Sequence, residues 1–310
     1  MPEKNYRWAI RNLVNRIMGF CLKSTNDMRK TVIFYIDPKR KYPGFVDILK
    51  AIIGCYYIAK ENGYQFKIYF EKPFLLSKFL EPADPINDWS LSEKQINRIN
   101  KLPISVGLLN YHGIGKIPKL HKEIYQVRNF IGWNILQRNH IDNWCSLWNR
   151  LYNELFKPSN FLQSAINGLG VNENEYIAVH IRFVNALELS EPDYPQKPLG
   201  EKDKERLINS CIKKVKAIET RENINAIVFS DSNLFLKRSL DCNVSVLNGN
   251  VGHITYNHSD GVVLKMFLDL YAIARSKKVF SLRGTHLYAS AFPLYGSVIG
   301  GKEFEIIELQ

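Results

Sequence analysis

Polar side chains that suit an anionic ligand follow three apolar stretches of this chain. The residue types are histidine and arginine at the first end, hydroxyl and carboxylate at the second, and arginine, glycine and hydroxyl at the third. The three sets are His180 with Arg182, Ser230 to Ser232, and Arg283 to Thr285. Because parallel strands end at one sheet edge, where open α/β proteins bind ligands, we expect the three sets to face one ligand.

The chemistry of these side chains favours a phosphorylated ligand. Strand alternation places His180 and Arg182 on the same side, and the guanidinium fork of arginine matches phosphate oxygens. Gly284 and Thr285 precede a short helix expected near His286, and a glycine, a hydroxyl and a helix N-terminus together suit a diphosphate. Structural roles stay open, because Asp231 and Thr285 also suit helix caps.

Asp269 is a charge within an otherwise apolar helical segment. A buried carboxylate needs a partner, and a nucleobase edge or a ribose hydroxyl would serve. An ion pair with a basic side chain is the structural alternative.

Strands and helices alternate along the whole chain. In the first half we expect strands at 31–36, 66–70 and 103–109 and a helix at 45–60. In the second half we expect strands at 176–182, 224–229, 244–247 and 278–282, with helices at 201–219 and 262–275. This alternation predicts an α/β protein with two Rossmann-like domains facing a cleft. The polar, glycine-rich segment 167–175 is the expected hinge between these domains, which comprise residues 1–167 and 168–310.

The composition limits the cellular compartments and the classes of binding partner that suit this protein. The 310 residues carry a formal charge of +12, which favours an anionic partner: a nucleic acid, an acidic membrane surface or a phosphorylated small molecule. The basic residues are scattered and show no RNA-binding signature, so a nucleic-acid-binding protein is kept only as an alternative. Five widely spaced cysteines, no leader-like N-terminus and no long apolar run predict a cytoplasmic protein.

Several common site motifs are missing from the sequence. There is no Walker loop and no GxGxxG element, which disfavours an ordinary ATPase or dehydrogenase. There is also no HxH, DxD or HExxH element, so we expect no metal in the chemistry.

At these residues the chain resembles the inverting fucosyltransferase superfamily, which includes core α-1,6-, nodulation-factor, protein-O- and bacterial α-1,2-fucosyltransferases. The family shares an H-x-R motif whose Arg holds the β-phosphate of GDP-fucose, a strand ending in T/S-D, a helix of the form L-D-x-x-x-L-S/A whose Asp contacts guanine, and an S-S turn that binds phosphate. The matching residues are His180 and Arg182, Ser230-Asp231-Ser232, Leu268-Asp269, and Arg283-Gly284-Thr285 in place of the S-S turn. The chain departs from the family at Phe183-Val184-Asn185.

The resemblance implies a GT-B transferase, with 1–167 on the acceptor side and 168–310 binding the nucleotide sugar. It implies metal-independent, inverting transfer of fucose from GDP-fucose to a glycan acceptor, with no cofactor. The candidate bases are Glu188 and Glu191, in the loop after H-x-R, and Asp47. The expected setting is bacterial surface polysaccharide or lipopolysaccharide synthesis, peripheral to the inner face of the membrane. A transferase that uses another nucleotide-activated donor is the alternative.

Overall fold

The structure is a computed structural model that describes residues 30–36, 43–101, 106–109, 116–128 and 134–309. The chain forms two compact units. The N-terminal unit comprises Met1–Arg40, Ile48–Lys72 and Pro82–Asp142, and the C-terminal unit comprises Lys41–Asp47, Pro73–Glu81 and Asn143–Gln310.

The N-terminal unit is built on a parallel sheet in the order β2-β1-β5-β4. Its strands are β1 (Thr31–Tyr35), β2 (Gln65–Tyr69), β4 (Val106–Leu108) and β5 (Ile124–Val127), and its helices include α2 (Phe45–Glu61), α3 (Glu93–Lys101) and α4 (Ile135–Arg138). Ile33 of β1 and Ile124 of β5 pack against Ile96 and Ile99 of α3. The expected strands and the α2 helix are therefore confirmed, except that 103–105 lie outside the described residues.

The C-terminal unit contains a second parallel sheet, in the order β11-β10-β7-β8-β9. The strands are β7 (Ile177–Ile181), β8 (Ala226–Ser230), β9 (Ser245–Val246), β10 (Lys278–Arg283) and β11 (Glu303–Glu308). Every residue of β7 and β8 is buried, as expected for strands covered on both faces. The four strands predicted in this half are confirmed, while β11 was not predicted.

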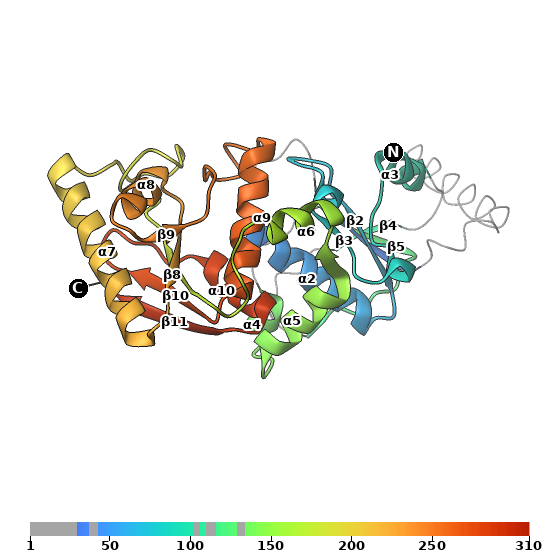
Figure 1. Ribbon diagram of the computed structural model, residues 1–310. Coiled ribbons are helices and arrows are strands. Elements are labelled where there is room, and N and C mark those ends of the chain that lie inside the picture. Colours follow the sequence, from blue (N-terminus) through green and yellow to red (C-terminus); the bar gives the residue numbers. More distant parts are fainter. Residues whose placement is uncertain (1–29, 37–42, 102–105, 110–115, 129–133, 310) are drawn as a thin grey trace, which may run out of the picture. The chain divides into compact units, whose positions relative to one another are not determined.

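Helices cover both faces of this sheet (Figure 1). On one face lie α7 (Glu201–Glu222) and α8 (Asn233–Asp241), and on the other lie α9 (Asp260–Arg275) and α10 (Ala291–Gly300). Ile177 and Val179 face Cys211 and Val215 of α7, whereas Ala178 faces Ile273 of α9. The alternation of side chains along β7 therefore builds two separate apolar layers.

The C-terminal unit also contains α5 (Trp144–Leu155), α6 (Asn160–Asn167) and a small sheet of β3 (Leu80–Pro82) and β6 (Phe156–Pro158). Helix α5 packs on α10, and α6 packs on α9. The division predicted at 167/168 would place α5 and α6 in the first domain; this division stays a prediction, as does the cleft between domains.

Glycines allow α10 to lie directly on α9. A Cβ atom on Gly300 would lie 1.8 Å from the carbonyl oxygen of Ala274, and one on Gly296 would lie 2.5 Å from Cγ2 of Ile273. Larger side chains would force the two helices apart. This contact fixes the direction of α10 and therefore the position of its first residues.

An aromatic cluster holds the first turn of α2 against α9 within the C-terminal unit. The ring of Phe267 stacks on Phe79 with centroids 4.6 Å apart, and its edge meets Phe45 at 4.8 Å. Phe74 contacts the same three rings. Such ring pairs contribute about 0.5–1.5 kcal/mol each beyond their buried area, so the cluster positions Asp47, which follows Phe45 by two residues.

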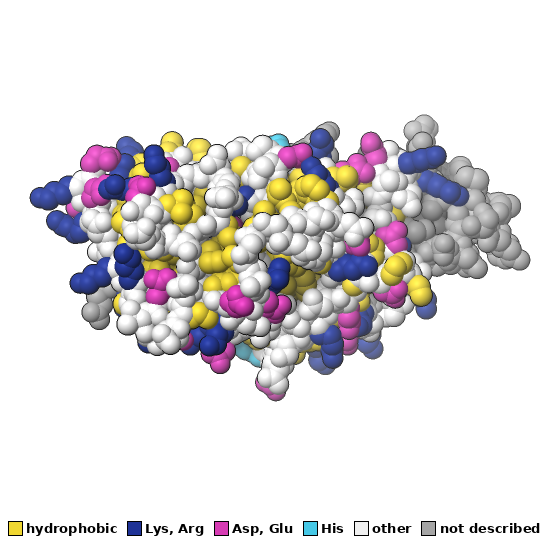
Figure 2. Space-filling view, in the orientation of Figure 1, with side chains coloured by type: hydrophobic (Ala, Val, Ile, Leu, Met, Phe, Trp, Pro, Cys, Tyr) yellow, Lys and Arg dark blue, Asp and Glu magenta, His cyan; other side chains and the backbone are white. Residues whose placement is uncertain are grey.

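Many basic side chains of the surface are paired with acids. Lys278 and Arg221 both contact Glu305, at 2.9 and 3.0 Å, and Arg238 pairs with Glu205. Figure 2 shows Lys and Arg side chains mixed with Asp and Glu over the face in view. Of the helices in the described residues, none combines the length and hydrophobicity that a membrane span requires.

Candidate functional site

A pocket of about 190 Å³ lies at the carboxyl edge of the C-terminal sheet. Its walls come from the ends of β7 and β8, the loop after β9, helix α9, the N-terminus of α10 and the first turn of α2. All of these segments belong to the C-terminal unit. The pocket brings together six sequence-predicted site residues: Asp47, His180, Arg182, Glu191, Asp231 and Asp269.

His180 and Arg182 enter the pocket from the end of β7. His180 is only 6% exposed, and its Nδ1 atom makes no hydrogen bond within the described part of the chain. Burial, reinforced by the positive charge of Arg182, lowers the pKa of His180 to about 3. The imidazole is therefore neutral at physiological pH and leaves one buried nitrogen without a partner in the pocket wall.

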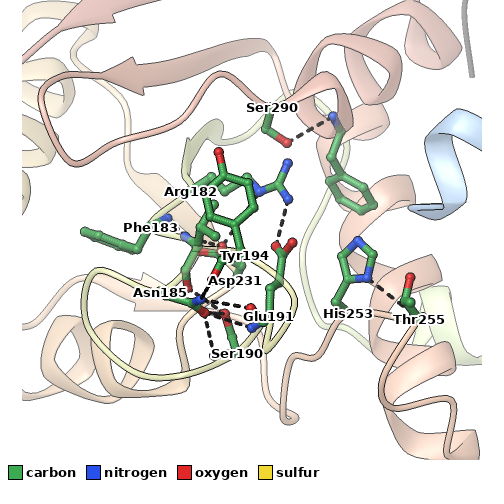
Figure 3. Close-up of polar contacts among 12 residues, drawn as sticks. Arg182, Phe183, Asn185, Ser190, Glu191, Tyr194, Asp231, His253, Thr255 and Ser290 are labelled. Atoms are coloured by element: carbon green, nitrogen blue, oxygen red, sulfur yellow. Dashed lines mark hydrogen bonds and ion pairs between the residues drawn. The ribbon is translucent and has the colours of Figure 1, made fainter. Parts of the chain in front are cut away.

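Two carboxylates orient the guanidinium of Arg182 (Figure 3). Its Nη2 donates to Oε1 of Glu191 at 2.8 Å, and its Nε lies 3.8 Å from Oδ2 of Asp231. Burial opposes the charge of Arg182, but Glu191 and then Asp231 outweigh it, so its pKa is raised. Arg182 is thus a fixed, fully charged donor in a partly buried site.

Asp231 also fastens the chain where it leaves β7. Its two carboxylate oxygens accept hydrogen bonds from the backbone N–H groups of Phe183 and Val184, each at 2.8 Å. Val184 has a φ of 55°, in the left-handed region that β-branched residues avoid. Burial raises the pKa of Asp231 to about 6, against the opposing effect of these N–H groups and of Arg182. The carboxylate holds a strained turn that aims the following loop.

Asn185 fixes the loop that carries Glu191. Its side-chain oxygen accepts from the N–H groups of Ser190 and Glu191, at 3.0 and 2.8 Å, and its amide donates to the carbonyl of Glu191 at 2.9 Å (Figure 3). Asn185 is fully buried. The segment in which the chain departs from the family pattern therefore positions the carboxylate that orients Arg182.

The three candidate bases differ in their surroundings. Glu188 does not line the pocket, and its Oε1 accepts from Ser232 Oγ and from the N–H of Leu234 at the start of α8. Ser232 itself is the N-cap of α8 and also lies outside the pocket lining. Glu191 and Asp47 do line the pocket, and Glu191 is bound to Arg182.

The partner of Asp269 is Lys265, one helical turn earlier on α9. The Lys265 Nζ atom lies 2.5 Å from Oδ1 of Asp269, and both side chains are more than nine-tenths buried. Burial raises the pKa of Asp269, and Lys265 opposes this. Because both residues line the pocket, the pair presents a carboxylate and an ammonium group on one wall.

The end of β10 does not reach the pocket lining. Gly284 pairs with Leu287 in an antiparallel bridge, so 284–287 form a turn, and Thr285 is exposed. The short helix expected near His286 is therefore wrong; α10 begins at Ala291 instead. The pocket is lined by 290–292 from the start of this helix, whereas Arg283, Gly284 and Thr285 lie outside it.

Ser290 caps α10 and was not recognised in the sequence. Its hydroxyl accepts from the N–H of Phe292 at 3.2 Å. Serine is a favoured N-cap, and proline is tolerated in the first turn of a helix because its missing N–H is not needed there, so Ser290 and Pro293 could have located this N-terminus. The positive end of the α10 dipole therefore lies at the pocket.

His253 is the second residue that sequence reasoning missed. Its Nδ1 accepts from the N–H of Thr255 at 3.3 Å, so the neutral ring carries its proton on Nε2. A Cβ atom on Gly44 would lie 3.5 Å from this Nε2 and 3.8 Å from Oδ2 of Asp47. Burial lowers the pKa of His253, Glu191 and Asp47 oppose this, and Arg182 adds to it. Its position in the loop after β9, at the same sheet edge, was the available signal.

Within the described residues, no three or more His, Cys, Asp or Glu side chains are grouped so that they could hold a metal ion. The polar groups of the pocket include Arg182, the neutral His253 and the Lys265 ammonium as donors, together with carboxylates.

No protein-family model and no curated protein matches the chain. Solved structures do. NodZ α-1,6-fucosyltransferase soaked with GDP-fucose aligns with a TM-score of 0.56 at 15% identity, over 87% of this chain and 92% of NodZ. The same enzyme with GDP gives a TM-score of 0.53 at the same identity and coverage. A mutant of Arabidopsis thaliana FUT1 in complex with GDP gives 0.52 at 11% identity, over 98% of this chain and 75% of that one.

The chain shares its fold with NodZ. At these identities the likeness establishes the fold alone, and it confirms the α/β class with parallel sheets that the alternation of strands and helices predicts.

Proposed function

We propose that this protein is an inverting, metal-independent glycosyltransferase that transfers fucose from GDP-fucose to a glycan acceptor. The observation that carries the proposal is Arg182, fixed by Glu191 and Asp231 at the end of β7 within the pocket. The NodZ crystals that share this fold were soaked with GDP-fucose in one case and co-crystallised with GDP in the other.

The leaving group of the reaction is a nucleoside diphosphate, and its developing negative charge requires fixed donors. Arg182 supplies a charged fork, Nε2–H of His253 supplies a neutral donor, and the N-terminus of α10 supplies backbone N–H groups. Loss of one such donor typically costs about 2.7–4 kcal/mol of transition-state stabilisation.

The acceptor hydroxyl attacks the anomeric carbon of fucose while the bond from that carbon to the diphosphate oxygen breaks, which inverts the configuration. The hydroxyl proton passes to a base, and Asp47 is the favoured one. The carboxylate of Glu191 is bound to Arg182, and Glu188 caps α8 outside the pocket. Glu191 therefore orients the guanidinium of Arg182, and Asp47 is left as the pocket carboxylate for the acceptor hydroxyl.

The Lys265–Asp269 pair is the proposed site for the nucleobase. Guanine presents a carbonyl acceptor and an amino donor, and an adjacent ammonium and carboxylate can match both. Lys265 and Asp269 already form an ion pair without a ligand. A bound guanine would therefore have to replace part of that contact with its own hydrogen bonds to the two side chains.

We further propose that the reaction serves bacterial surface polysaccharide or lipopolysaccharide synthesis at the inner face of the membrane. The formal charge of +12 supports attraction to an anionic surface. Co-sedimentation with phosphatidylglycerol vesicles, compared with phosphatidylcholine vesicles, tests this part, and equal binding to both would contradict it.

The test of the donor is a thermal-shift and calorimetry series with GDP, UDP, CDP and ADP, each with and without Mg²⁺. GDP should stabilise the protein most and without metal, by about 2.7 kcal/mol at 100 times its dissociation constant. Turnover is then measured as GDP release from GDP-fucose. Equal shifts from all four nucleotides, or a shift that needs Mg²⁺, would contradict the assignment. A stronger response to another diphosphate would favour a different nucleotide-activated donor.

A further inference from the structure

Three tyrosines are fastened by their backbones to the rim of the pocket. Each donates its N–H to the carbonyl oxygen of a pocket-lining residue; Tyr194 and Tyr256 do so within their own turns, and Tyr288 does so across to the end of β7. The bonds are Tyr194 to Glu191 at 2.9 Å, Tyr256 to His253 at 2.9 Å, and Tyr288 to Arg182 at 2.8 Å. We call Tyr194, Tyr256 and Tyr288 the tyrosine cluster.

Side-chain contacts join the three segments into one surface. The rings of Tyr194 and Tyr288 meet edge to face, with centroids 5.5 Å apart. The hydroxyl of Tyr256 donates to Oδ2 of Asp193 at 3.1 Å, and the hydroxyl of Tyr288 donates to Gln196. The cluster is therefore ordered before any ligand arrives, so little side-chain entropy is lost on binding.

The tyrosine cluster is not part of an apolar core. Tyr194 and Tyr256 are 39% and 37% exposed, and none of the three belongs to the buried layers around the sheet. Exposed rings beside a carboxylate and an amide provide both apolar faces and hydrogen-bonding groups. A pyranose needs this combination, because it has flat C–H faces and equatorial hydroxyls, and tyrosine offers an apolar ring with a polar tip.

We propose that the tyrosine cluster, with Asp193 and Gln196, is a carbohydrate-binding subsite that holds a neutral sugar unit of the acceptor next to the pocket. Its role as the acceptor subsite rests on the proposed glycosyl transfer, whereas sugar binding itself does not. The backbone bonds to Arg182, Glu191 and His253 place the bound sugar beside the groups proposed to act on the donor.

The experiment measures binding of the full chain, without nucleotide, to an array of neutral oligosaccharides. The array carries α- and β-linked glucose, galactose, mannose and N-acetylglucosamine oligomers, and the best one is then titrated in solution by calorimetry. The variants are Tyr194→Ala, Tyr256→Ala and Tyr256→Phe. Phe161→Ala is the matched control, because Phe161 is an aromatic residue of the same unit that is 46% exposed on α6.

We expect the wild type to retain at least one class of oligosaccharide. Each alanine variant should weaken that binding about tenfold, which corresponds to about 1.4 kcal/mol. Tyr256→Phe keeps the ring but loses the hydroxyl bound to Asp193, so it should weaken binding less than Tyr256→Ala, whereas Phe161→Ala should bind nearly as the wild type. Unchanged melting temperatures confirm that the variants fold. Absence of any retained sugar, or equal binding by the two alanine variants and the wild type, overturns the subsite.

The GDP response is measured on the same samples. Stabilisation by GDP without sugar binding would agree with the proposed transferase activity and contradict the proposed sugar subsite. Sugar binding without a nucleotide response keeps the subsite and removes the transferase proposal.

Discussion

An arginine lies at the carboxyl end of each of two neighbouring strands in the C-terminal sheet, directly after β7 and as the last residue of β10, yet only the arginine after β7 lines the pocket. Strands β7 and β10 pair in register, with His180 opposite Ser281. After β7 the chain leaves the sheet in a strained turn held by Asp231, and Arg182 contacts two carboxylates. Strand β10 instead continues beside β11 as far as Arg283, which lies outside the pocket lining.

The difference teaches that an arginine at the correct edge of a sheet is not sufficient for a site. What matters is the anchoring of the chain that follows the strand. After β7, Asp231 and Asn185 fix that chain through backbone N–H groups. After β10, the chain closes on itself between Gly284 and Leu287, which directs Thr285 to solvent.

The largest effect should come from the carboxylate in the first turn of α2. Asp47 lines the same pocket as Arg182. If fucose transfer takes place in this pocket, Asp47→Ala removes the proton acceptor and lowers the transfer rate by about 10²–10⁴-fold, while GDP still binds. GDP release from GDP-fucose, beside calorimetry with GDP, measures both. Glu188→Ala is the control, because that carboxylate lies outside the pocket; it should keep transfer and lower the melting temperature as α8 loses an N-terminal partner. Equal transfer by wild type and Asp47→Ala would remove Asp47 from the reaction.

The two arginines provide the direct comparison. Arg182→Lys keeps the charge but loses the bidentate fork, so turnover should fall by about two orders of magnitude. Arg283→Lys should change turnover by less than about threefold, since a substitution away from the site usually costs little. Steady-state GDP release under saturating donor measures both variants. Similar losses in the two variants would mean that both strand ends serve the ligand.

The Asp231 carboxyl group, which holds the turn after β7, should make the free energy of unfolding depend on pH. The pKa of Asp231 rises from 3.8 to about 6 on folding, mainly through burial. The folded state therefore holds this proton more tightly, and the stability that it contributes is present below pH 3.8 and lost as the pH rises through 6. The loss is on the order of 2–3 kcal/mol.

Asp231→Asn has no such proton. The difference in unfolding free energy, wild type minus variant, should therefore decrease between pH 4 and pH 7. Denaturant unfolding at several pH values measures it, and a constant difference would show that Asp231 is ionised throughout.

The smallest effect should come from the turn after β10. Thr285→Ala alters an exposed side chain outside the pocket, so transfer should stay within about twofold and stability within about 0.5 kcal/mol. GDP affinity and GDP release measure the outcome. A tenfold loss of GDP affinity or of GDP release would show that this turn contributes to donor binding.

Local patterns were sufficient for most of the secondary structure. The apolar spacing of Leu207, Ile208, Cys211, Ile212 and Val215 predicts one face of α7; the last four are buried, and Leu207 is partly buried against the same apolar layer. Gly284-Thr285 predicts a helix start near His286, whereas α10 begins after Ser290, six residues beyond Gly284. The place of His253 after β9 indicated the sheet edge but not the pocket, because a histidine in a polar loop becomes part of a pocket only through contacts that are remote in sequence.

The sequence by itself determined the strands, their polar ends and the edge at which those ends meet, because alternation and turn residues act over a few positions. Only the tertiary structure decided which polar residues share the pocket. Asp47 reaches it through the packing of Phe45 on Phe267, Glu191 through the hydrogen bonds of Asn185, and α10 through its glycine contacts with α9. Each of these contacts joins segments that the backbone leaves free to lie elsewhere, and only side-chain packing selects one arrangement.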